Sequence, residues 1–164
     1  MAKTGEMVYV GIDPGINGGI CLIFPDSKTH YIEIHKCPAT IRDMADILDD
    51  WIDPSATVRA VIEKVHAFPG QGVTSMFNFG KNFGTWLGIL NGLRIPYVEV
   101  SPQKWMKVYG SMPKDKRKRK NHLKEMAQSL YPQEKITLRT ADAVLLAHFS
   151  LGIGLMDNVQ VNIA

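Results

Sequence analysis

Three acidic side chains stand in apolar segments where a charge is uncommon. Asp13 ends the β-forming run 8–13 and is followed at once by a proline and several glycines. Glu63 lies near the end of a second apolar run, and Asp142 opens an apolar helical segment. Each acid alone has an ordinary explanation, namely a turn, an ion pair with a neighbouring base or a favourable helix start. Together they raise the possibility of a shared site.

Carboxylates brought close together repel one another, so such a cluster persists only with a cation or with a raised pKa. Oxygen ligands of this kind suit Mg²⁺ or Mn²⁺ and not a structural zinc. Asp13 and Glu63 become neighbours if the strand that carries Glu63 lies parallel beside the first strand. A helix that returns over that sheet can bring Asp142 to the same edge. The three acids therefore form a candidate metal site.

The elements that must position these acids follow from the apolar pattern. Residues 7–13, 18–24 and 30–36 alternate as three consecutive strands joined by short turns. Later segments alternate between helix and strand, which predicts an α/β sheet covered by helices. The expected later elements are a helix over 40–52, strands over 58–68 and 95–102, and helices over 73–93, 102–109, 114–130 and 140–151.

Length and composition predict one domain over residues 1–164 with a proper hydrophobic core. Hydrophobic residues make up 45% and charged residues 21% of the chain, as in soluble globular proteins. Neither the N-terminus nor any internal run has the apolar length of a signal peptide or a membrane span. We therefore expect a cytoplasmic protein with no membrane partner. Cys21 and Cys37 have no metal or disulfide spacing and are expected to be buried.

The positive charge is concentrated in residues 114–120, KDKRKRK, which hold six basic side chains and one acid. The net charge of the whole chain is only +3, so the block is a local feature. It favours a polyanion bound at one face, whereas a solvated surface or a localisation signal is the alternative.

The motifs GIDPG, VIEKV and TADAVLLA, in this order and with VEVSPQKWMKVYG before the last of them, resemble those of the RuvC-type Holliday junction resolvases. The likeness covers about residues 7–153, and the details GINGG and DAVLLA are closer to the phage-borne branch. It implies a ribonuclease H-like fold: a mixed five-stranded sheet, its first three strands an antiparallel meander, with helices on both faces.

The resemblance also implies an activity. Asp13, Glu63 and Asp142 would be the metal ligands of a two-metal nuclease that uses Mg²⁺, with Mn²⁺ as a substitute. Its substrate would be branched DNA, chiefly four-way junctions, cut by paired nicks that leave 5′-phosphate and 3′-hydroxyl ends. One residue departs from the pattern: Arg139 stands where the family usually carries a fourth acid or a histidine. The number of tightly held metals is therefore open.

Further site residues follow from the resemblance and from the basic block. A family active-site lysine maps to Lys118, 14 residues before the proline of LYP, with Lys116 and Lys120 as alternatives. His66 or Phe68 would stack on an unpaired base, unless Phe68 is a core residue and His66 a surface one. The basic residues expected to grip DNA are Lys114, Lys116, Arg117, Arg119, Lys120 and Lys104.

Gly80, Gly84 and Gly88 recur four residues apart in a helical segment, although each interior glycine costs about 1 kcal/mol relative to alanine. Such a stripe permits close approach of another helix or of the protein's own sheet. Since the family dimerises through this region, we expect a homodimer with these glycines at the interface, which suits a substrate with two strands to cut.

Three other functions remain open. A ribonuclease H-like enzyme could act on RNA or on RNA–DNA hybrids. GIDPGINGG also resembles the first phosphate loop of actin-like ATPases and sugar kinases, but these need two such domains and 164 residues are too few. Arg139 finally suggests a protein that binds junctions without cutting them.

Overall fold

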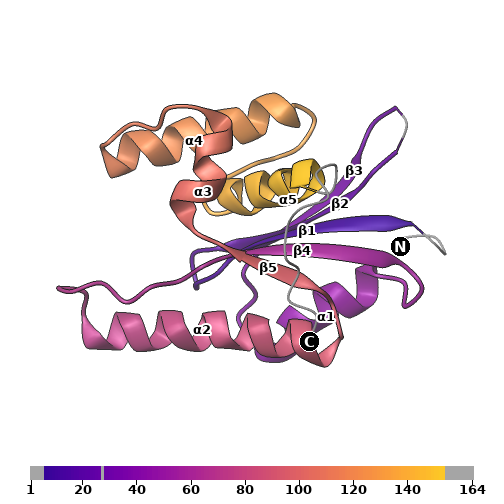
Figure 1. The fold of residues 1–164 in the computed structure, drawn as a ribbon, viewed down its shortest axis with the longest axis horizontal. Coiled ribbons are helices and arrows are strands. Elements are labelled where there is room, and N and C mark those ends of the chain that lie inside the picture. Colours follow the sequence, from indigo (N-terminus) through magenta and orange to yellow (C-terminus); the bar gives the residue numbers. More distant parts are fainter. Residues whose placement is uncertain (1–5, 27, 154–164) are drawn as a thin grey trace.

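The computed structural model describes residues 6–26 and 28–153, and five strands there form one mixed sheet (Figure 1). The strand order is β3-β2-β1-β4-β5. The first three strands form an antiparallel meander, whereas β4 lies parallel to β1 and β5 parallel to β4. This topology confirms the predicted fold. The strands are β1 (Met7–Asp13), β2 (Gly19–Phe24), β3 (Tyr31–Lys36), β4 (Thr57–Glu63) and β5 (Tyr97–Val100).

Helices cover both faces of the sheet (Figure 1). One face carries α1 (Ile41–Trp51) and α2 (Val73–Gly92). The other face carries a group of helices that are close in sequence: α3 (Pro102–Met106), which continues as a 3₁₀ turn, α4 (Lys116–Leu130) and α5 (Ala141–Ile153). None of the helices within the described ranges is both long and apolar enough to cross a membrane.

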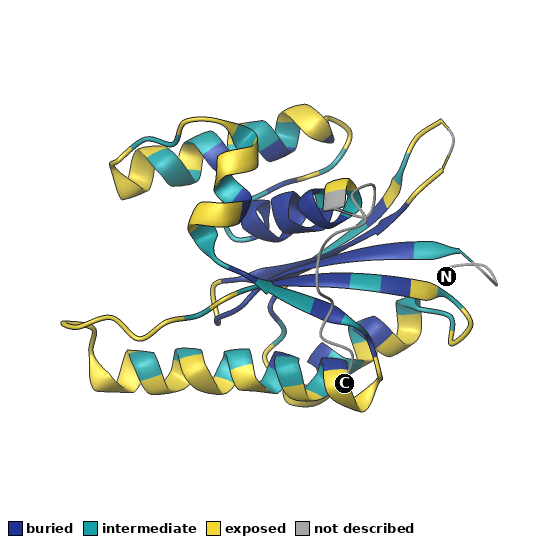
Figure 2. Cartoon of the chain, viewed as in Figure 1, coloured by how far each residue is buried: buried dark blue, intermediate teal, exposed yellow. Residues whose placement is uncertain are grey.

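Side-chain alternation along β1 divides the core into two layers. Val8, Val10 and Ile12 are buried against α1 and α2, whereas Tyr9 packs with α4 and α5. Figure 2 shows that α5 and the central strands are buried, whereas α2 is exposed along much of its length. The most buried helix, α5, lies directly on β1.

Gly11 makes the close contact between α5 and β1 possible. A Cβ at this position would lie 2.1 Å from the Ala147 nitrogen and 2.3 Å from the Ala143 oxygen, so only glycine fits. Because successive side chains alternate, Asp13 is on the same face as Gly11, the face that α5 covers. Asp142, in the first turn of α5, is therefore carried toward Asp13.

Candidate active site

The three acidic residues come together at one edge of the sheet. Asp13 ends β1 and Glu63 ends β4, and the parallel pairing of Ile12 with Ile62 sets the two acids side by side, as the sequence predicted for parallel strands. Asp142 reaches this edge from the first turn of α5. Parallel strands and a helix packed across them thus bring together residues that lie up to 129 positions apart.

Asp13 and Asp142 are buried, at 9% and 4% exposed. Burial makes Asp13 and Glu63 costly to ionise. Burial raises the pKa of Asp13 well above its usual value, and the charges of Asp142 and Glu63 raise it further. Burial likewise raises the pKa of Glu63 to about 7, with Asp142 adding to the effect. The three groups therefore interact strongly and favour a cation among them.

Lys120 supplies one such cation. Its ammonium group forms an ion pair with Asp142 Oδ2. Burial alone would lower the pKa of Lys120, but the three carboxylates together hold it above its usual value. The same positive charge lowers the pKa of both Asp13 and Glu63. Lys120 is therefore a fixed, charged partner of the acidic cluster.

Lys120, and not Lys118, is the lysine at the acids. Lys116, Lys120, Leu123 and Ala127 share one face of α4, and the last two are buried in the core. Lys118 is two residues from Lys120, on the opposite side of the helix, and its side chain is exposed. Of the two lysines, the structure therefore places the alternative, Lys120, beside the acids, and a catalytic role for it stays a prediction.

Trp105 is a site residue that sequence reasoning did not single out. Its indole Nε1–H donates a hydrogen bond of 2.7 Å to Glu63 Oε2, and the side chain is fully buried. This bond favours the ionised carboxylate and lowers the pKa of Glu63 against the effect of burial. The only signal in the sequence is the tryptophan of SPQKW, whose partner cannot be read from spacing.

The donor set fits a hard divalent cation. Asp142 Oδ1 is buried and has no hydrogen-bond partner within the described chain, so one oxygen is free to accept a ligand. Three carboxylates supply the all-oxygen environment that Mg²⁺ or Mn²⁺ prefers. In the described ranges, however, no three Asp, Glu, His or Cys side chains are close enough to hold an ion as a group. A metal would therefore have to draw the carboxylates closer together.

A cleft of about 1060 Å³ opens onto the acids. It is bordered by the loop 14–18, by one side of α2 and by the start of α4. Gly15 N–H donates a hydrogen bond of 2.7 Å to Asn82 Oδ1, which ties the loop to α2. The charged residues that line the cleft are three acids and four bases: Asp13, Glu63, Asp142, Lys81, Lys116, Lys120 and Arg139.

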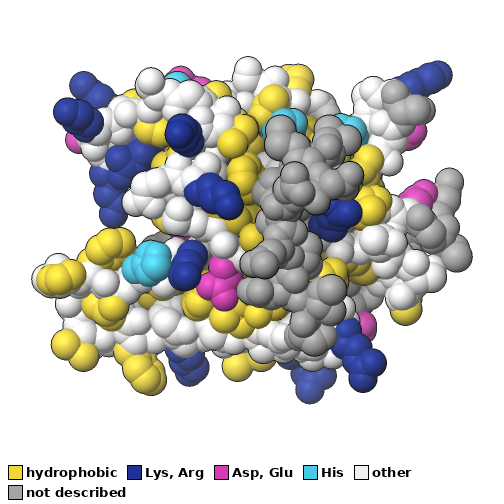
Figure 3. Space-filling model, viewed as in Figure 1, with side chains coloured by type: hydrophobic (Ala, Val, Ile, Leu, Met, Phe, Trp, Pro, Cys, Tyr) yellow, Lys and Arg dark blue, Asp and Glu magenta, His cyan; other side chains and the backbone are white. Residues whose placement is uncertain are grey.

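Most of the other predicted DNA-binding residues lie on the protein surface. Lys and Arg side chains gather over the N-terminal half of α4, at one end of the face that Figure 3 shows. Phe68 is 57% exposed, so the alternative that it belongs to the core is wrong. The exposed members of the predicted set are Lys104, Lys114, Lys116, Arg117 and His66, whereas Arg119 is half-buried and donates to the Pro113 and Lys114 carbonyl oxygens.

The glycine stripe of α2 faces outward. A Cβ on Gly80, Gly84 or Gly88 would meet no heavy atom of the described chain within 4 Å. The alternative that these glycines pack on the protein's own sheet is therefore wrong. Val73 and Phe77 continue the same stripe and are 85% and 70% exposed.

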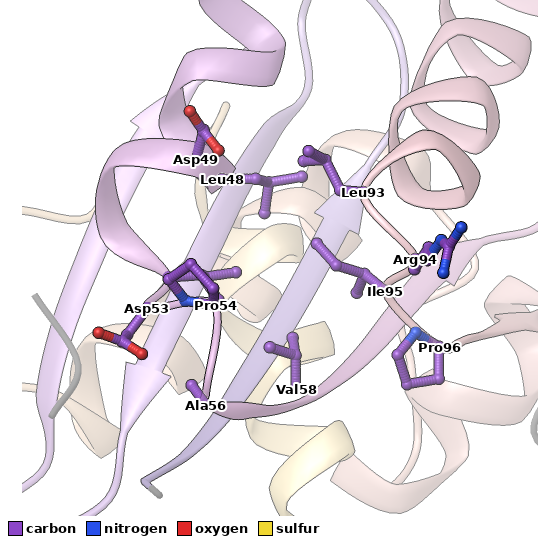
Figure 4. Close-up of a pocket in the computed structure, with 11 residues that line it drawn as sticks. Leu48, Asp49, Asp53, Pro54, Ala56, Val58, Leu93, Arg94, Ile95 and Pro96 are labelled. Atoms are coloured by element: carbon purple, nitrogen blue, oxygen red, sulfur yellow. The ribbon is translucent and has the colours of Figure 1, made fainter. Parts of the chain in front are cut away.

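A second hollow, of about 260 Å³, lies at the opposite end of the sheet (Figure 4). Its apolar lining includes Val58, near the start of β4, and Ile95, two residues before β5. Its charged residues are Asp49, Asp53 and Arg94. This hollow is therefore separate from the acidic cluster, which lies at the other ends of the strands.

A mixed sheet of this order, with acids at the ends of β1 and β4 and at the start of α5, has the ribonuclease H-like architecture. The fold is that of RuvC. A structure of T. thermophilus RuvC in complex with a Holliday junction substrate superposes with a TM-score of 0.67 at 14% identity, covering 94% of this chain and 99% of that one. Another Thermus thermophilus RuvC structure superposes with a TM-score of 0.60 at 16% identity, covering 90% of this chain and 97% of that one. No family model matches the sequence, and no curated protein does.

Proposed function

We propose that this protein is a metal-dependent endonuclease that cuts four-way DNA junctions. The observation that carries the proposal is the cluster of the buried Asp13 and Asp142 with the half-buried Glu63, which opens onto a cleft lined by four basic side chains. The RuvC-like fold supports it, because one of the similar structures holds a Holliday junction.

Each residue of the cluster has a role in this proposal. Asp13, Glu63 and Asp142 would hold Mg²⁺, for which Mn²⁺ would substitute, with two ions per site as the resemblance implies. A bound divalent metal supplies an activated water and stabilises the charge on the leaving oxygen. Trp105 orients Glu63, and Lys120 places positive charge beside the phosphate that is attacked. The products carry 5′-phosphate and 3′-hydroxyl ends.

The surface around the cleft binds the arms of the junction. The exposed bases of the 114–120 block and Lys104 contact phosphates, and each contact adds affinity that weakens with salt. Lys118 belongs to this group. Phe68, or His66 beside it, stacks on an unpaired base at the crossover, a contact worth about 1–3 kcal/mol.

The remaining features of the proposal concern the whole protein. The chain acts as one domain, in the cytoplasm, and is of the phage-borne type. Two copies pair through the outward glycine face of α2, which gives one active site for each of the two strands to be cut.

The substrate class is tested with a labelled four-way junction, a linear duplex of the same sequence and an RNA–DNA hybrid. Each is incubated with Mg²⁺, with Mn²⁺ and with EDTA. We expect paired nicks in the junction that need the metal, and no comparable cutting of the other two. Preferential cutting of the hybrid would instead make the protein a ribonuclease.

A junction-binding protein without cleavage is the second candidate. The ion pair of Lys120 with Asp142 favours it, because this lysine already partly neutralises the carboxylates. It predicts tight, salt-sensitive junction binding with no cutting in either metal.

A further inference from the structure

Among the described residues, Arg139 is the cation of the cleft that forms no ion pair with an acid and that the fold holds in place. It lies in the turn before α5 and lines the same cleft as Asp13 and Asp142. Of the other bases there, Lys120 is paired with Asp142. Lys81 and Lys116 are exposed, with long side chains that remain free to move.

The guanidinium of Arg139 is anchored on one side only. Nη2–H donates a hydrogen bond of 2.5 Å to the carbonyl oxygen of Ile16. The buried Nε–H has no hydrogen-bond partner within the described chain. A guanidinium carries five N–H donors in a planar fork, so most of the hydrogen-bonding capacity of Arg139 is unused.

The loop that holds Arg139 is itself rigid. Gly18 N–H bonds to the Gly15 oxygen at 2.9 Å, and Gly15 N–H bonds to Asn82 at 2.7 Å. Gly15 has a positive φ of 111°, and a Cβ on Gly18 would lie 1.9 Å from the Asp13 oxygen, so both positions require glycine. The loop, which directly follows Asp13 in the chain, therefore holds Arg139 at the cleft that Asp13 also lines.

We propose that Arg139 binds a backbone phosphate of the DNA strand that enters the cleft. This inference rests on the proposed function and names one residue that holds its substrate. A preorganised planar guanidinium is the side chain best suited to a phosphate, because it makes two parallel charge-assisted hydrogen bonds. Arg139 thereby offsets the repulsion between the strand and the three carboxylates.

The test measures binding without metal, so that it does not depend on cleavage. The affinity of Arg139→Gln and Arg139→Lys for a labelled four-way junction is measured in EDTA over a series of salt concentrations. Arg94→Gln is the matched control, since Arg94 is an exposed arginine at the opposite end of the sheet (Figure 4).

We expect Arg139→Gln to bind at least roughly tenfold more weakly, as for a lost hydrogen bond between charged groups. The slope of log affinity against log salt should become shallower by about 0.9, the value for one phosphate contact. Arg139→Lys should keep most of the slope, and Arg94→Gln should behave like the parent.

An unchanged salt slope in Arg139→Gln would overturn the inference, even if its melting temperature fell, because Arg139 would then only anchor the loop. A parent protein that bound no junction at any salt concentration would overturn the proposed function as well. The two failures are therefore distinguishable.

Discussion

The carboxylate of Glu63 depends on a residue from a distant part of the chain. Trp105 follows β5, yet its indole N–H reaches Glu63 at the end of the neighbouring strand. Burial raises the pKa of Glu63 to about 7, and the hydrogen bond works in the opposite direction. A metal ligand must be ionised, so activity should fall as the pH drops and Glu63 takes up a proton.

Replacing Trp105 by Phe removes the donor that favours ionised Glu63. The pKa of Glu63 should rise further, so the acidic limb of the pH–rate profile at fixed Mg²⁺ should move to higher pH. We expect a shift of about one pH unit, because a hydrogen bond to a charged group contributes roughly 1.5 kcal/mol.

Trp86→Phe is the control for this shift. Trp86 is also fully buried, but its Nε1–H has no hydrogen-bond partner within the described residues. Replacing Trp86 by Phe removes the same volume from the core but should leave the acidic limb of the pH–rate profile unchanged. Equal profiles for both variants would show that the Trp105 bond does not tune Glu63.

Lys120→Met should lower the single-turnover cleavage rate at saturating protein by roughly 10²- to 10³-fold, the typical effect of losing one stabilising donor. Lys118→Met removes the same charge from the exposed side of α4 and should weaken DNA binding with little effect on that rate. A larger loss of rate in Lys118→Met would return the catalytic role to Lys118.

Much of the site at the residue scale could be predicted from the sequence. Asp13, Glu63 and Asp142 were singled out as a set because their three motifs, in order, resemble those of the resolvase family, whereas each acid alone had an ordinary explanation. Lys120 could not be chosen from a run of six bases, because only the packing of Leu123 and Ala127 sets which side of α4 faces inward. The hydrogen bond from Trp105 to Glu63 joins residues 42 positions apart, so no periodic pattern in the sequence predicts it.

At the scale of elements, the contact of α5 with β1 brings the site together. Gly11→Ala places a methyl group against the backbone of Ala143 and Ala147, which cannot yield as a flexible side chain would. We expect the free energy of unfolding to fall by about 3 kcal/mol or more, measured by denaturant titration.

Gly80→Ala is the contrasting variant. Its methyl group enters open space on an exposed helix face, so the monomer should gain up to about 1 kcal/mol of stability. If Gly11→Ala were as stable as the parent, α5 would not lie on β1 as closely as described.

The elements themselves were largely predictable. The predicted bounds agree within a residue or two for the strands over 7–13, 18–24 and 30–36 and for the start of the helix after Thr40. Their apolar pattern predicts them because these side chains do pack in the core. The outward face of α2 was expected only from the resemblance, because exposed apolar residues such as Val73 and Phe77 look like core residues in the sequence. Hydrophobic periodicity cannot distinguish a core from a surface made for another molecule.

At the scale of the whole molecule, the exposed glycine face of α2 predicts how two copies meet. Gly84→Leu fills the space that close helix approach requires and should convert a dimeric parent to a monomer in sedimentation velocity. Thr74→Leu, exposed on another side of the same helix, should stay dimeric. A parent that is monomeric at all concentrations would contradict this assembly.

The most direct test of the whole account compares cleavage of a four-way junction by the parent and by Asp13→Asn in Mg²⁺, at protein concentrations that saturate binding. Asp53→Asn, on the surface at the far end of the sheet, is the matched control. We expect the parent and Asp53→Asn to introduce paired nicks, and Asp13→Asn to bind the junction but leave it uncut. Cleavage by Asp13→Asn at the parental rate would show that the three carboxylates are not the catalytic centre.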